Sequence, residues 1–374
     1  MKWKEYSLDE LINIKHGYAF KGEFFSEEPT DDILLTPGNF AIGGGFKAQK
    51  LKYYNGDFPV DYILDENDVI VTMTDLSKEA DTLGFSAKVP AWYGKRFLHN
   101  QRIGLVKLKT DDFDKDYLYW LMRTFSYQRF VANGATGATV KHTSPTKICQ
   151  YKFTAPDDKT TQRKIASILS AYDDLIENNL KRIKLLEEKA FLRYKLIVRE
   201  EKMQVEEKLE NLIQTVKRKA KIPKSDYKEK GEFPIIDQST DFIGGYTNEK
   251  EVVYEDLPMI VFGDHTRILK YVNFPFACGA DGTQLIKPNN PNISVAYLYF
   301  ELINCNLSNY HYARHFKFLK EQVIKLPSEK VMLEYKEETD KIFNLIQLLR
   351  LQNTKLREAR DILLPKLMNG QIEV

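Results

Sequence analysis

Residues 160–197 read TTQRKIASILSAYDDLIENNLKRIKLLEEKAFLRYKLI, and this stretch decides the fold. Its apolar side chains recur at alternating steps of three and four residues, which is the spacing of a coiled-coil seam. The pattern predicts one helix of roughly 40 residues, about 60 Å long at 1.5 Å per residue. The seam positions are Ile165, Ile168, Tyr172, Ile176, Ile183, Leu186, Ala190, Tyr194 and Ile197, with Asn179 filling a gap between them.

The C-terminal part of the chain carries a second seam of the same kind. The two seams can bury each other as an antiparallel coiled coil, in which the numbers of facing residues sum to roughly 530. Asn179 and Asn353 then lie near its middle, where a seam asparagine costs stability but fixes the register. Pro365 and Gly370 are expected to end the second helix. Two core helices of separate domains are the alternative. The second seam consists of Tyr335, Thr339, Ile342, Leu345, Leu349, Leu356 and Leu363, with Asn353 inside it.

Four short strings recur in the same order in the two halves of the sequence. Because the shift between the copies only shrinks along the chain, we expect an internal duplication whose second copy is shorter. The pairs are Leu8–Ile12 with Leu209–Ile213, Asp75–Lys78 with Asp264–Arg267, Tyr117–Trp120 with Tyr297–Phe300, and Leu175–Glu177 with Leu345–Gln347.

Outside the seams the sequence predicts mixed α and β structure. Asp68–Met73 and Ile103–Leu108 have the composition of strands, and Tyr117–Val131 has the pattern of an amphipathic helix. We therefore expect two duplicated globular α/β domains, separated by two long helices that form an antiparallel coiled coil. The expected boundaries are 1–157 for the first domain, 158–202 for the first helix, 203–329 for the second domain and 330–374 for the second helix.

Composition limits the classes of function. The chain has 374 residues, of which 43% are apolar, and this is enough for two or three folded domains. The net charge of +2 gives no bulk attraction to nucleic acid, so any such binding must come from local patches. Two basic patches are present: Lys217–Lys221, and a group near His311 and His315 that contains Arg314, Lys317, Lys320 and Lys325.

The cysteines and the apolar runs bear on the cellular compartment. Cys149, Cys278 and Cys305 are an odd number at unrelated spacings, which does not favour a disulfide or zinc framework. The N-terminal residues lack the apolar stretch of a signal peptide, and no window approaches the roughly 18 apolar residues of a membrane span. We expect a reducing, cytoplasmic location.

Catalytic motifs are not apparent in the sequence. A methyltransferase acting on an exocyclic base nitrogen needs an Asn/Asp-Pro-Pro-aromatic loop, and Asn290–Ile293 lacks both the second proline and the aromatic residue. Neither Gly43–Gly45 nor Gly134–Gly137 forms a phosphate-binding loop, so both are expected to be turns. A nuclease interpretation of Pro156–Asp157 with Glu187–Lys189 fails because the second string lies on the predicted helix. His311 and His315 lack neighbours that would complete a metal site. A Ser/His/Asp or Cys/His triad stays open at the level of sequence, but no motif points to catalysis or to a metal site.

Several strings give the chain a resemblance to a known family. The order of domain, long helix, domain and long helix resembles the specificity subunit of type I restriction-modification systems, the HsdS family. The resemblance spans nearly the whole chain. The strings that carry it are Gly17–Lys21, Gln162–Leu169, Phe233–Ser239, Phe262–Arg267 and Leu363–Gly370.

This resemblance implies a non-catalytic DNA reader in a larger complex. In the family, two target recognition domains each read one half of a bipartite, gapped, double-stranded DNA sequence. The helices dock two modification subunits, which bind S-adenosylmethionine and methylate adenine. Restriction subunits, which use ATP and Mg, translocate and cut the DNA. The resemblance therefore implies that these cofactors belong to the partners, and that this chain binds none of them.

Candidate DNA contacts are exposed polar groups at duplicated positions. Base edges are read by side chains such as Arg, Asn and Gln, whereas Lys and backbone amides fix the register on phosphates. Asp75 and Asp264 could equally be residues that only cap or turn the chain. The candidates are Thr74, Ser77, Lys78, His99, Asn100, Gln101, Arg102, Lys141 and His142 in the first domain, and Lys217, His265, Thr266, Arg267, Arg314, His315 and Lys317 in the second.

Two other classes of function remain open at the level of sequence. A self-sufficient DNA-modifying enzyme would transfer methyl groups or cut DNA when purified alone. A coiled-coil scaffold would bind protein partners without DNA specificity.

Overall fold

The computed structural model describes residues 2–77, 79–200, 205–279, 282–307 and 314–374. The chain divides into two compact units. Unit 1 comprises residues 1–176 and 355–374, and unit 2 comprises residues 177–354. Each unit therefore contains one globular α/β region together with a segment of each of two long helices.

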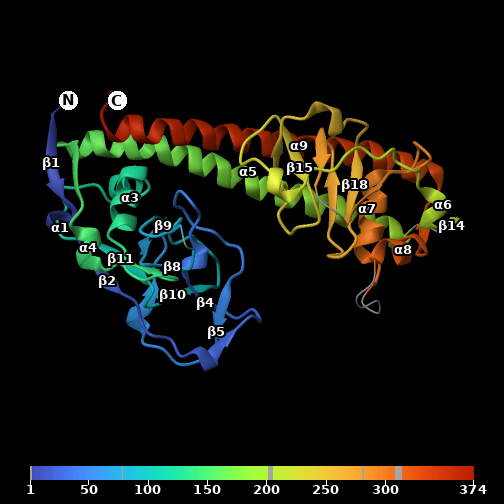
Figure 1. The fold of residues 1–374 in the computed structure, drawn as a ribbon. Helices are drawn as coiled ribbons and strands as arrows, with labels where there is room; N and C mark the ends of the chain where they lie inside the picture. Colours follow the sequence, from blue (N-terminus) through green and yellow to red (C-terminus); the bar gives the residue numbers. More distant parts are fainter. Residues whose placement is uncertain (1, 78, 201–204, 280–281, 308–313) are drawn as a thin grey trace. The chain divides into compact units, whose positions relative to one another are not determined.

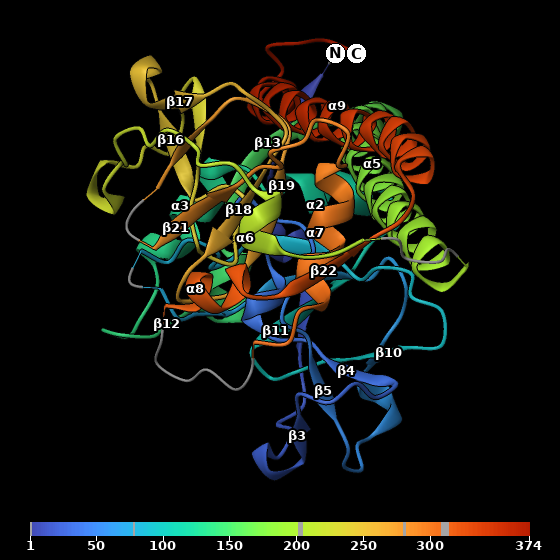
Figure 2. The ribbon, with the colours of Figure 1, turned by 90° about the vertical axis from the view of Figure 1, so that its right-hand side faces the viewer.

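The two long helices are α5 (Lys159–Glu200) and α9 (Glu329–Met368). They pack side by side and run antiparallel, as the seams predict (Figures 1 and 2). Within unit 2, the amide of Asn179 donates a hydrogen bond to Asn353 Oδ1 at 2.9 Å, and both side chains are buried. The predicted pairing sum is confirmed, and the two seam asparagines are direct partners.

The buried side chains differ from the predicted seam at some positions, of which one on each helix is the clearest. Ile168 is partly exposed, and its neighbour Leu169 is fully buried. On α9, Ile346 is buried where the pattern placed Leu345. At these two positions the buried side chain is thus one residue away from the predicted one. The cause is that each helix also packs against a globular core, which rotates the buried stripe around the helix.

The sequence predicts that Pro365 ends the second helix, and this prediction is wrong. Helix α9 continues through Pro365 to Met368, and Gly370 then takes a positive φ of 75°. Leu364, Leu367 and Met368 are buried in the core of unit 1. This burial outweighs the cost of a proline near the helix end.

Unit 1 contains two main sheets. One is ordered β2-β11-β7-β9, and the other β3-β5-β4-β10-β6, with β4 and β10 parallel. The predicted strands at 68–73 and 103–108 are confirmed as β7 and β11, which pair antiparallel. The strands are β2 (Ile12–His16), β3 (Phe25–Ser26), β4 (Asp32–Leu34), β5 (Lys52–Tyr54), β6 (Ile63–Leu64), β7 (Val69–Thr72), β9 (Ser86–Lys88), β10 (Arg96–Leu98) and β11 (Ile103–Leu108).

Unit 2 repeats this arrangement with fewer strands. Its first sheet is ordered β21-β18-β19, and Ile213 bridges Pro288 beside β21, where β2 lies in unit 1. Its second sheet is ordered β16-β15-β20-β17, with β15 and β20 parallel. The strands are β15 (Phe233–Ile236), β16 (Gly245–Thr247), β17 (Val253–Tyr254), β18 (Met259–Gly263), β19 (Leu269–Val272), β20 (Phe276–Cys278) and β21 (Thr283–Ile286).

The same order of strands in both units confirms the internal duplication. Its first repeated string forms short helices α1 (Leu8–Leu11) and α6 (Leu209–Leu212), and both bury their leucines. The first amide of each short helix makes an equivalent backbone hydrogen bond. Leu8 N donates to Tyr151 O at 3.0 Å, and Leu209 N donates to Gln322 O at 2.9 Å.

The helix predicted over 117–131 is broken into two. Helix α2 (Lys115–Leu121) and helix α3 (Phe125–Asn133) are separated by a turn at Met122–Thr124. The Thr124 side chain caps the second helix by accepting a hydrogen bond from Tyr127 N. In unit 2 the single helix α7 (Val295–Asn304) corresponds to α2.

Both globular regions are closed by a strand pair that lies just before the long helix. In unit 1, β1 (Trp3–Ser7) pairs antiparallel with β13 (Lys152–Pro156), which precedes α5. In unit 2, β14 (Val205–Lys208) pairs antiparallel with β22 (Val323–Leu326), which precedes α9. The chain therefore enters and leaves each globular region at the same place.

Charged side chains fasten the globular part of unit 1 to its helices. Arg123 is buried, and its Nη1 donates to Asp173 Oδ2 on α5 at 2.6 Å. Arg360 on α9 donates to the other oxygen of Asp173. The Arg123 guanidinium also lies 4.2 Å from the ring centre of Trp120. Burial alone would raise the pKa of Asp173, but the two arginines outweigh it and hold that pKa below its usual value.

A glycine turn wraps around Arg123. Gly43, Gly44 and Gly45 all have positive φ, and Arg123 Nε donates to Gly43 O at 3.0 Å. A Cβ atom at Gly44 would lie 2.5 Å from Arg123 Cγ, so only glycine allows this approach. The glycine cluster is a turn, as expected, and its role is to cover a buried arginine.

Aromatic side chains take the corresponding place in unit 2. The rings of Tyr271 and Phe343 stack with centres 3.9 Å apart, which joins β19 to α9. Asn273 donates to Phe343 O at 3.0 Å. Unit 2 also has an ionic contact between its two helices, Arg350 with Glu187 at 2.9 Å, and both side chains are partly exposed. Burial raises the pKa of Glu187, and Arg350 opposes this shift only in part.

Candidate nucleic-acid interface

In unit 1 the predicted contact residues gather at one end of the β2-β11-β7-β9 sheet. Met73 N donates to Arg102 O at 2.9 Å, and Thr143 N donates to Met73 O at 3.0 Å. Strand β12 (Lys141–His142) pairs with β8 (Thr74–Asp75). Three segments that are distant in sequence thus meet at the end of β7.

Gly17 allows the turn at 99–102 to form. A Cβ atom at Gly17 would lie 2.1 Å from Asn100 O, so the backbone can approach only because the side chain is absent. Tyr18 N donates to His99 O at 2.8 Å, and Gln101 N donates to Tyr18 O at 2.9 Å. The string Gly17–Lys21, which carries part of the family resemblance, therefore supports the predicted site.

Three of the predicted contacts in unit 1 are buried. His99 is fully buried, its Nε2 lies 2.8 Å from Ile103 O, and burial lowers its pKa to about 4. Asn100 Oδ1 accepts a hydrogen bond from Arg102 N at 3.1 Å, and Thr74 Oγ1 lies 3.2 Å from His142 Nδ1. Because His99, Asn100 and Thr74 have almost no exposed surface, they hold the turns in place and offer DNA no direct contact in this conformation.

The other candidates in unit 1 are accessible. Gln101, Arg102 and His142 are exposed, and Ser77 and Lys141 are partly exposed. Lys78 lies outside the described residues. Asp75 is buried and accepts hydrogen bonds from Ser77 N at 2.7 Å and from both N and Oγ1 of Thr82. Burial would raise the Asp75 pKa, but these hydrogen bonds hold it below its usual value. Asp75 therefore has the capping role.

In unit 2 a buried aspartate organises the equivalent end of the sheet. Asp264 N donates to Gly282 O at 2.7 Å, and Asp264 O accepts from His315 N at 3.0 Å. Its carboxylate Oδ1 accepts from Phe316 N at 2.8 Å, at the start of α8 (His315–Lys320). Asp264 thus joins the turn after β18 to α8, which again is a structural role.

The turn that follows Asp264 presents three predicted residues. His265, Thr266 and Arg267 are exposed. Arg267 has a positive φ of 62°, and its Nη1 donates to Leu307 O at 3.2 Å. Thr266 Oγ1 donates to the backbone O of Gln238 at 2.8 Å. Gln238, which sequence reasoning missed, belongs to the string Phe233–Ser239 and so had a signal that could have identified it.

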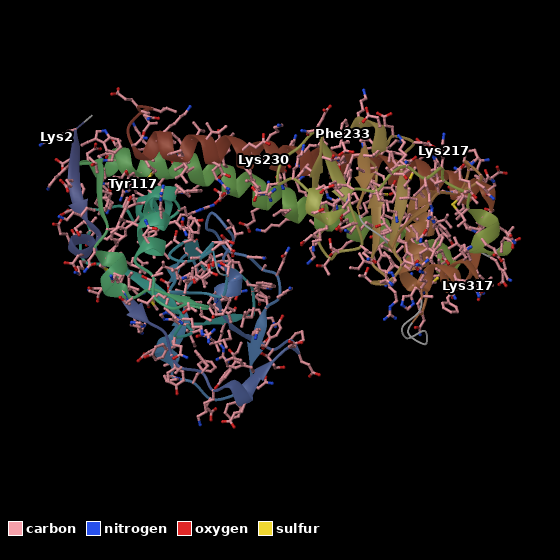
Figure 3. All side chains as sticks on the ribbon, in the orientation of Figure 1. Lys2, Tyr117, Lys217, Lys230, Phe233 and Lys317 are labelled. Carbon is pink, nitrogen blue, oxygen red and sulfur yellow. The ribbon has the colours of Figure 1, made fainter. Side chains whose placement is uncertain are left out.

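The remaining predicted residues of unit 2 differ in exposure. His315 is buried, and its Nδ1 has no hydrogen-bond partner among the residues that the structure describes. Arg314, Lys217 and Lys317 are exposed. Figure 3 labels Lys217 and Lys317, and both lie on unit 2.

The two basic patches predicted from sequence meet in one groove of unit 2. A hollow of about 270 Å³ is lined by Arg218 and Lys221 from the first patch and by Arg314 from the second. An adjoining hollow of about 410 Å³ shares Arg218 and Lys221 and adds Lys320. We call these two hollows the basic groove; Gln284 on β21 lines both of them.

The described residues contain neither a metal cluster nor a membrane helix. No three His, Cys, Asp or Glu side chains gather within the described ranges in a way that could hold a metal ion. In that same part of the chain, no helix is both long and apolar enough to cross a membrane. Cys149, Cys278 and Cys305 are all free thiols.

Comparison with known proteins agrees with this architecture. The crystal structure of the type I restriction-modification system S subunit from M. genitalium is similar over 98% of this chain and 96% of its own, with a TM-score of 0.61 and 17% identity. A stretch of 174 residues, 46% of this chain, is 25% identical to the type I restriction enzyme EcoBI specificity subunit of Escherichia coli. That match spans only 33% of the length of the Escherichia coli protein.

The family assignment rests on the N-terminal half of the chain. Residues 1–188 match the family described as the type I restriction modification DNA specificity domain. This range includes the first globular region and most of α5. The chain therefore belongs to the type I restriction modification DNA specificity domain family.

Proposed function

We propose that this chain is the DNA-reading subunit of a type I restriction-modification complex, and that each unit reads one half of a bipartite, gapped DNA target. The observation that carries the proposal is the duplication. In both units, exposed polar side chains gather at the same end of the equivalent sheet, on turns that buried residues hold rigid. A rigid turn with exposed Arg, Gln or His side chains suits contact with base edges in the major groove.

The exposed candidates divide between the two half-sites. In unit 1 they are Gln101, Arg102 and His142, and Ser77 and Lys141 are partly exposed. In unit 2 they are His265, Thr266, Arg267 and Arg314, with Lys217 and Lys317 available for the DNA backbone. Loss of a base contact such as Arg267 would cost roughly 1 to 3 kcal/mol of binding and relax only the second half-site.

The proposal assigns catalysis to the partners. We infer that this chain transfers no methyl group and cuts no DNA, and that it acts in the cytoplasm. Its long helices would dock two modification subunits that carry S-adenosylmethionine. Restriction subunits that use ATP and Mg would complete the complex. The chain purified alone should then show neither methyl transfer nor cleavage.

The target should be gapped with a fixed spacing. Two readers on one rigid spacer that contact the same face of B-DNA should have half-site centres roughly 10 base pairs apart. Half-sites of three to five base pairs would then leave an unread gap of roughly five to seven.

The test exchanges one reader. Residues 1–157 are replaced by the equivalent domain of a relative, the chimera is co-expressed with modification subunits, and the methylated sites are mapped across the host genome. We expect one half of the target to change and the other half to stay. The unaltered chain with the same partners is the control. Methylation at a continuous, ungapped site, or a change in both halves together, would contradict the proposal.

A further inference from the structure

We propose that the basic groove of unit 2 binds a phosphate of the DNA backbone, and that Arg218, Lys221 and Arg314 are its ligands. This inference rests on the proposed function and refines it. It moves Arg314 from a reader of sequence to a group that fixes the register of unit 2 on the duplex. It also adds Arg218 and Lys221, to which sequence reasoning gave no individual role.

The three cations converge although they are far apart in the sequence. Arg218 and Lys221 lie in the segment that follows α6, and Arg314 directly precedes α8. All three line the same hollow of about 270 Å³, together with His265, Gly282 and Gln284. Three like charges around one hollow repel one another, and a bound anion relieves that repulsion.

Neutral partners hold two of these cations in place. Arg218 Nη2 donates to Gln284 Oε1 at 3.1 Å, and Lys221 Nζ donates to Thr283 O at 3.3 Å. Across the described residues, no carboxylate lies within 4.0 Å of the charged nitrogens of Arg218, Lys221 or Arg314. Their charge is thus oriented but not neutralised within the described part of unit 2.

Among the described residues, Asp264 is the one carboxylate that lines the smaller hollow, and it is already engaged; Glu210 lines the adjoining hollow. Asp264 is buried, its Oδ1 accepts from Phe316 N at 2.8 Å, and its Oδ2 accepts from Gln284 Nε2 at 3.3 Å. Gln284 therefore links Asp264 to Arg218 through its two side-chain atoms. With three cations against one carboxylate among its described lining residues, the smaller hollow carries a net positive charge, which suits a phosphodiester.

The shape of the hollow favours phosphate over base edges. A side chain that reads a base must project into the groove of the duplex, whereas a phosphate projects outward and can enter a hollow. A base flipped out of the duplex would need aromatic or apolar walls on which to stack. The smaller hollow is lined almost entirely by charged and polar side chains. Two guanidinium groups also match the paired oxygens of a phosphate.

The experiment combines protein variants with neutralised DNA. Complexes with modification subunits carry wild-type chain, Arg218→Gln, Arg314→Gln or Arg314→Lys, and Lys230→Gln, an exposed lysine outside the groove, serves as the matched control. Each complex is titrated with target duplexes that have a single uncharged methylphosphonate linkage, moved one position at a time along both strands. The salt dependence of binding is measured in parallel.

For the wild type we expect one or two linkages beside the second half-site at which neutralisation weakens binding about tenfold. Arg218→Gln and Arg314→Gln should weaken binding to all sequences alike, reduce the salt slope by about one, and lose the sensitivity at those linkages. Arg314→Lys should retain most of the sensitivity to neutralised linkages, because lysine keeps the positive charge, and Lys230→Gln should behave as wild type. Sequence preference at both half-sites should persist in every variant, which also shows that the complexes are assembled.

Three outcomes would overturn the inference. If Arg314→Gln relaxes base preference in the second half-site while the linkage sensitivity remains, Arg314 reads bases. If no linkage beside the second half-site matters in the wild type, or if Lys230→Gln acts like the groove variants, the groove holds no specific phosphate. In these cases the wild type still prefers its target. A wild-type complex that does not distinguish target from random duplex would instead overturn the proposed function as well.

Discussion

The two units attach equivalent globular folds to the same pair of helices by different chemistry. Unit 1 uses the largely buried Arg123–Asp173–Arg360 cluster, in which Arg123 is fully buried and Asp173 keeps some exposure, whereas unit 2 uses the stacked rings of Tyr271 and Phe343. A buried ion pair is directional and tolerates little displacement, because breaking it leaves a charge without compensation. Stacked rings slide more easily at small cost. We expect the orientation of the first globular region on its helices to be defined more sharply than that of the second.

Asp173→Asn should have the largest effect on this comparison. It leaves two arginines against a neutral amide in a largely buried site, so we expect the free energy of unfolding of unit 1 to fall by about 2 to 4 kcal/mol. Trp3, Trp92 and Trp120 all lie in unit 1, so tryptophan fluorescence during urea unfolding reports on this unit. The matched variant Glu187→Gln in unit 2 should change stability by less than about 1 kcal/mol in either direction, measured by hydrogen exchange. Equal losses would show that both units depend on charge.

Acid should remove the contribution of Asp173. Its folded pKa lies below the unfolded value of about 4, so its contribution to stability is complete above that pH and is lost as the pH falls toward the folded pKa. The folded pKa of Glu187 is raised, so its ionisation costs stability and acid relieves that cost. Unfolding of unit 1 followed from pH 7 to pH 3 should show a steeper loss below about pH 4 in the wild type than in Asp173→Asn. Parallel curves would contradict the assignment.

Phe343→Leu tests the aromatic attachment of unit 2. We expect a loss of about 1 to 2 kcal/mol, because the ring stacking disappears while most of the apolar volume remains. Hydrogen exchange of strand β19 reports the loss. Leu351→Ala is the control, because this side chain is exposed on the same helix and should change stability by less than about 0.5 kcal/mol. A Phe343→Leu effect as small as that of the control would mean that the stacking is dispensable.

The seam asparagines should have the smallest effect on stability. Replacing both Asn179 and Asn353 with Leu removes both buried amides, and we expect a gain of about 1 kcal/mol in the free energy of unfolding. The gain should come with a looser register. Mapping methylation on targets of different gap lengths would detect this as a broader gap preference. An unchanged gap preference would mean that the two flanking attachments alone fix the register.

Periodic features could be predicted from the sequence because they recur. The seams, the duplicated strings and the strands at 68–73 and 103–108 follow from spacing alone. Spacing alone did not predict which side chains of each helix are buried. Leu169 and Ile346 are buried because they contact the globular cores of their units. Pro365 remains helical for the same reason. The free energy gained by burying Leu364 and Leu367 in the core of unit 1 exceeds the local cost of a proline in a helix, and local propensity does not contain that gain.

Contacts between distant segments could not be predicted. Arg123 lies in an unremarkable helical pattern, and its partners Gly43, Asp173 and Arg360 are scattered along the chain. For the candidate site, the structure shows only accessibility: Gln101, Arg102 and His265 are exposed turn residues, as a DNA contact requires. His99 and His315 have the same residue type but are buried, and nothing in their local sequence distinguishes them from exposed histidines.

Unit 1 is built from two pieces, residues 1–176 and 355–374, and this bears on how the chain is made. During synthesis the first globular region leaves the ribosome long before Leu364, Leu367 and Met368, which fill part of its core. The apolar face of α5 stays uncovered over the same interval. A stop codon near residue 355 should therefore disable the N-terminal reader first, although every residue of its sheets has been translated.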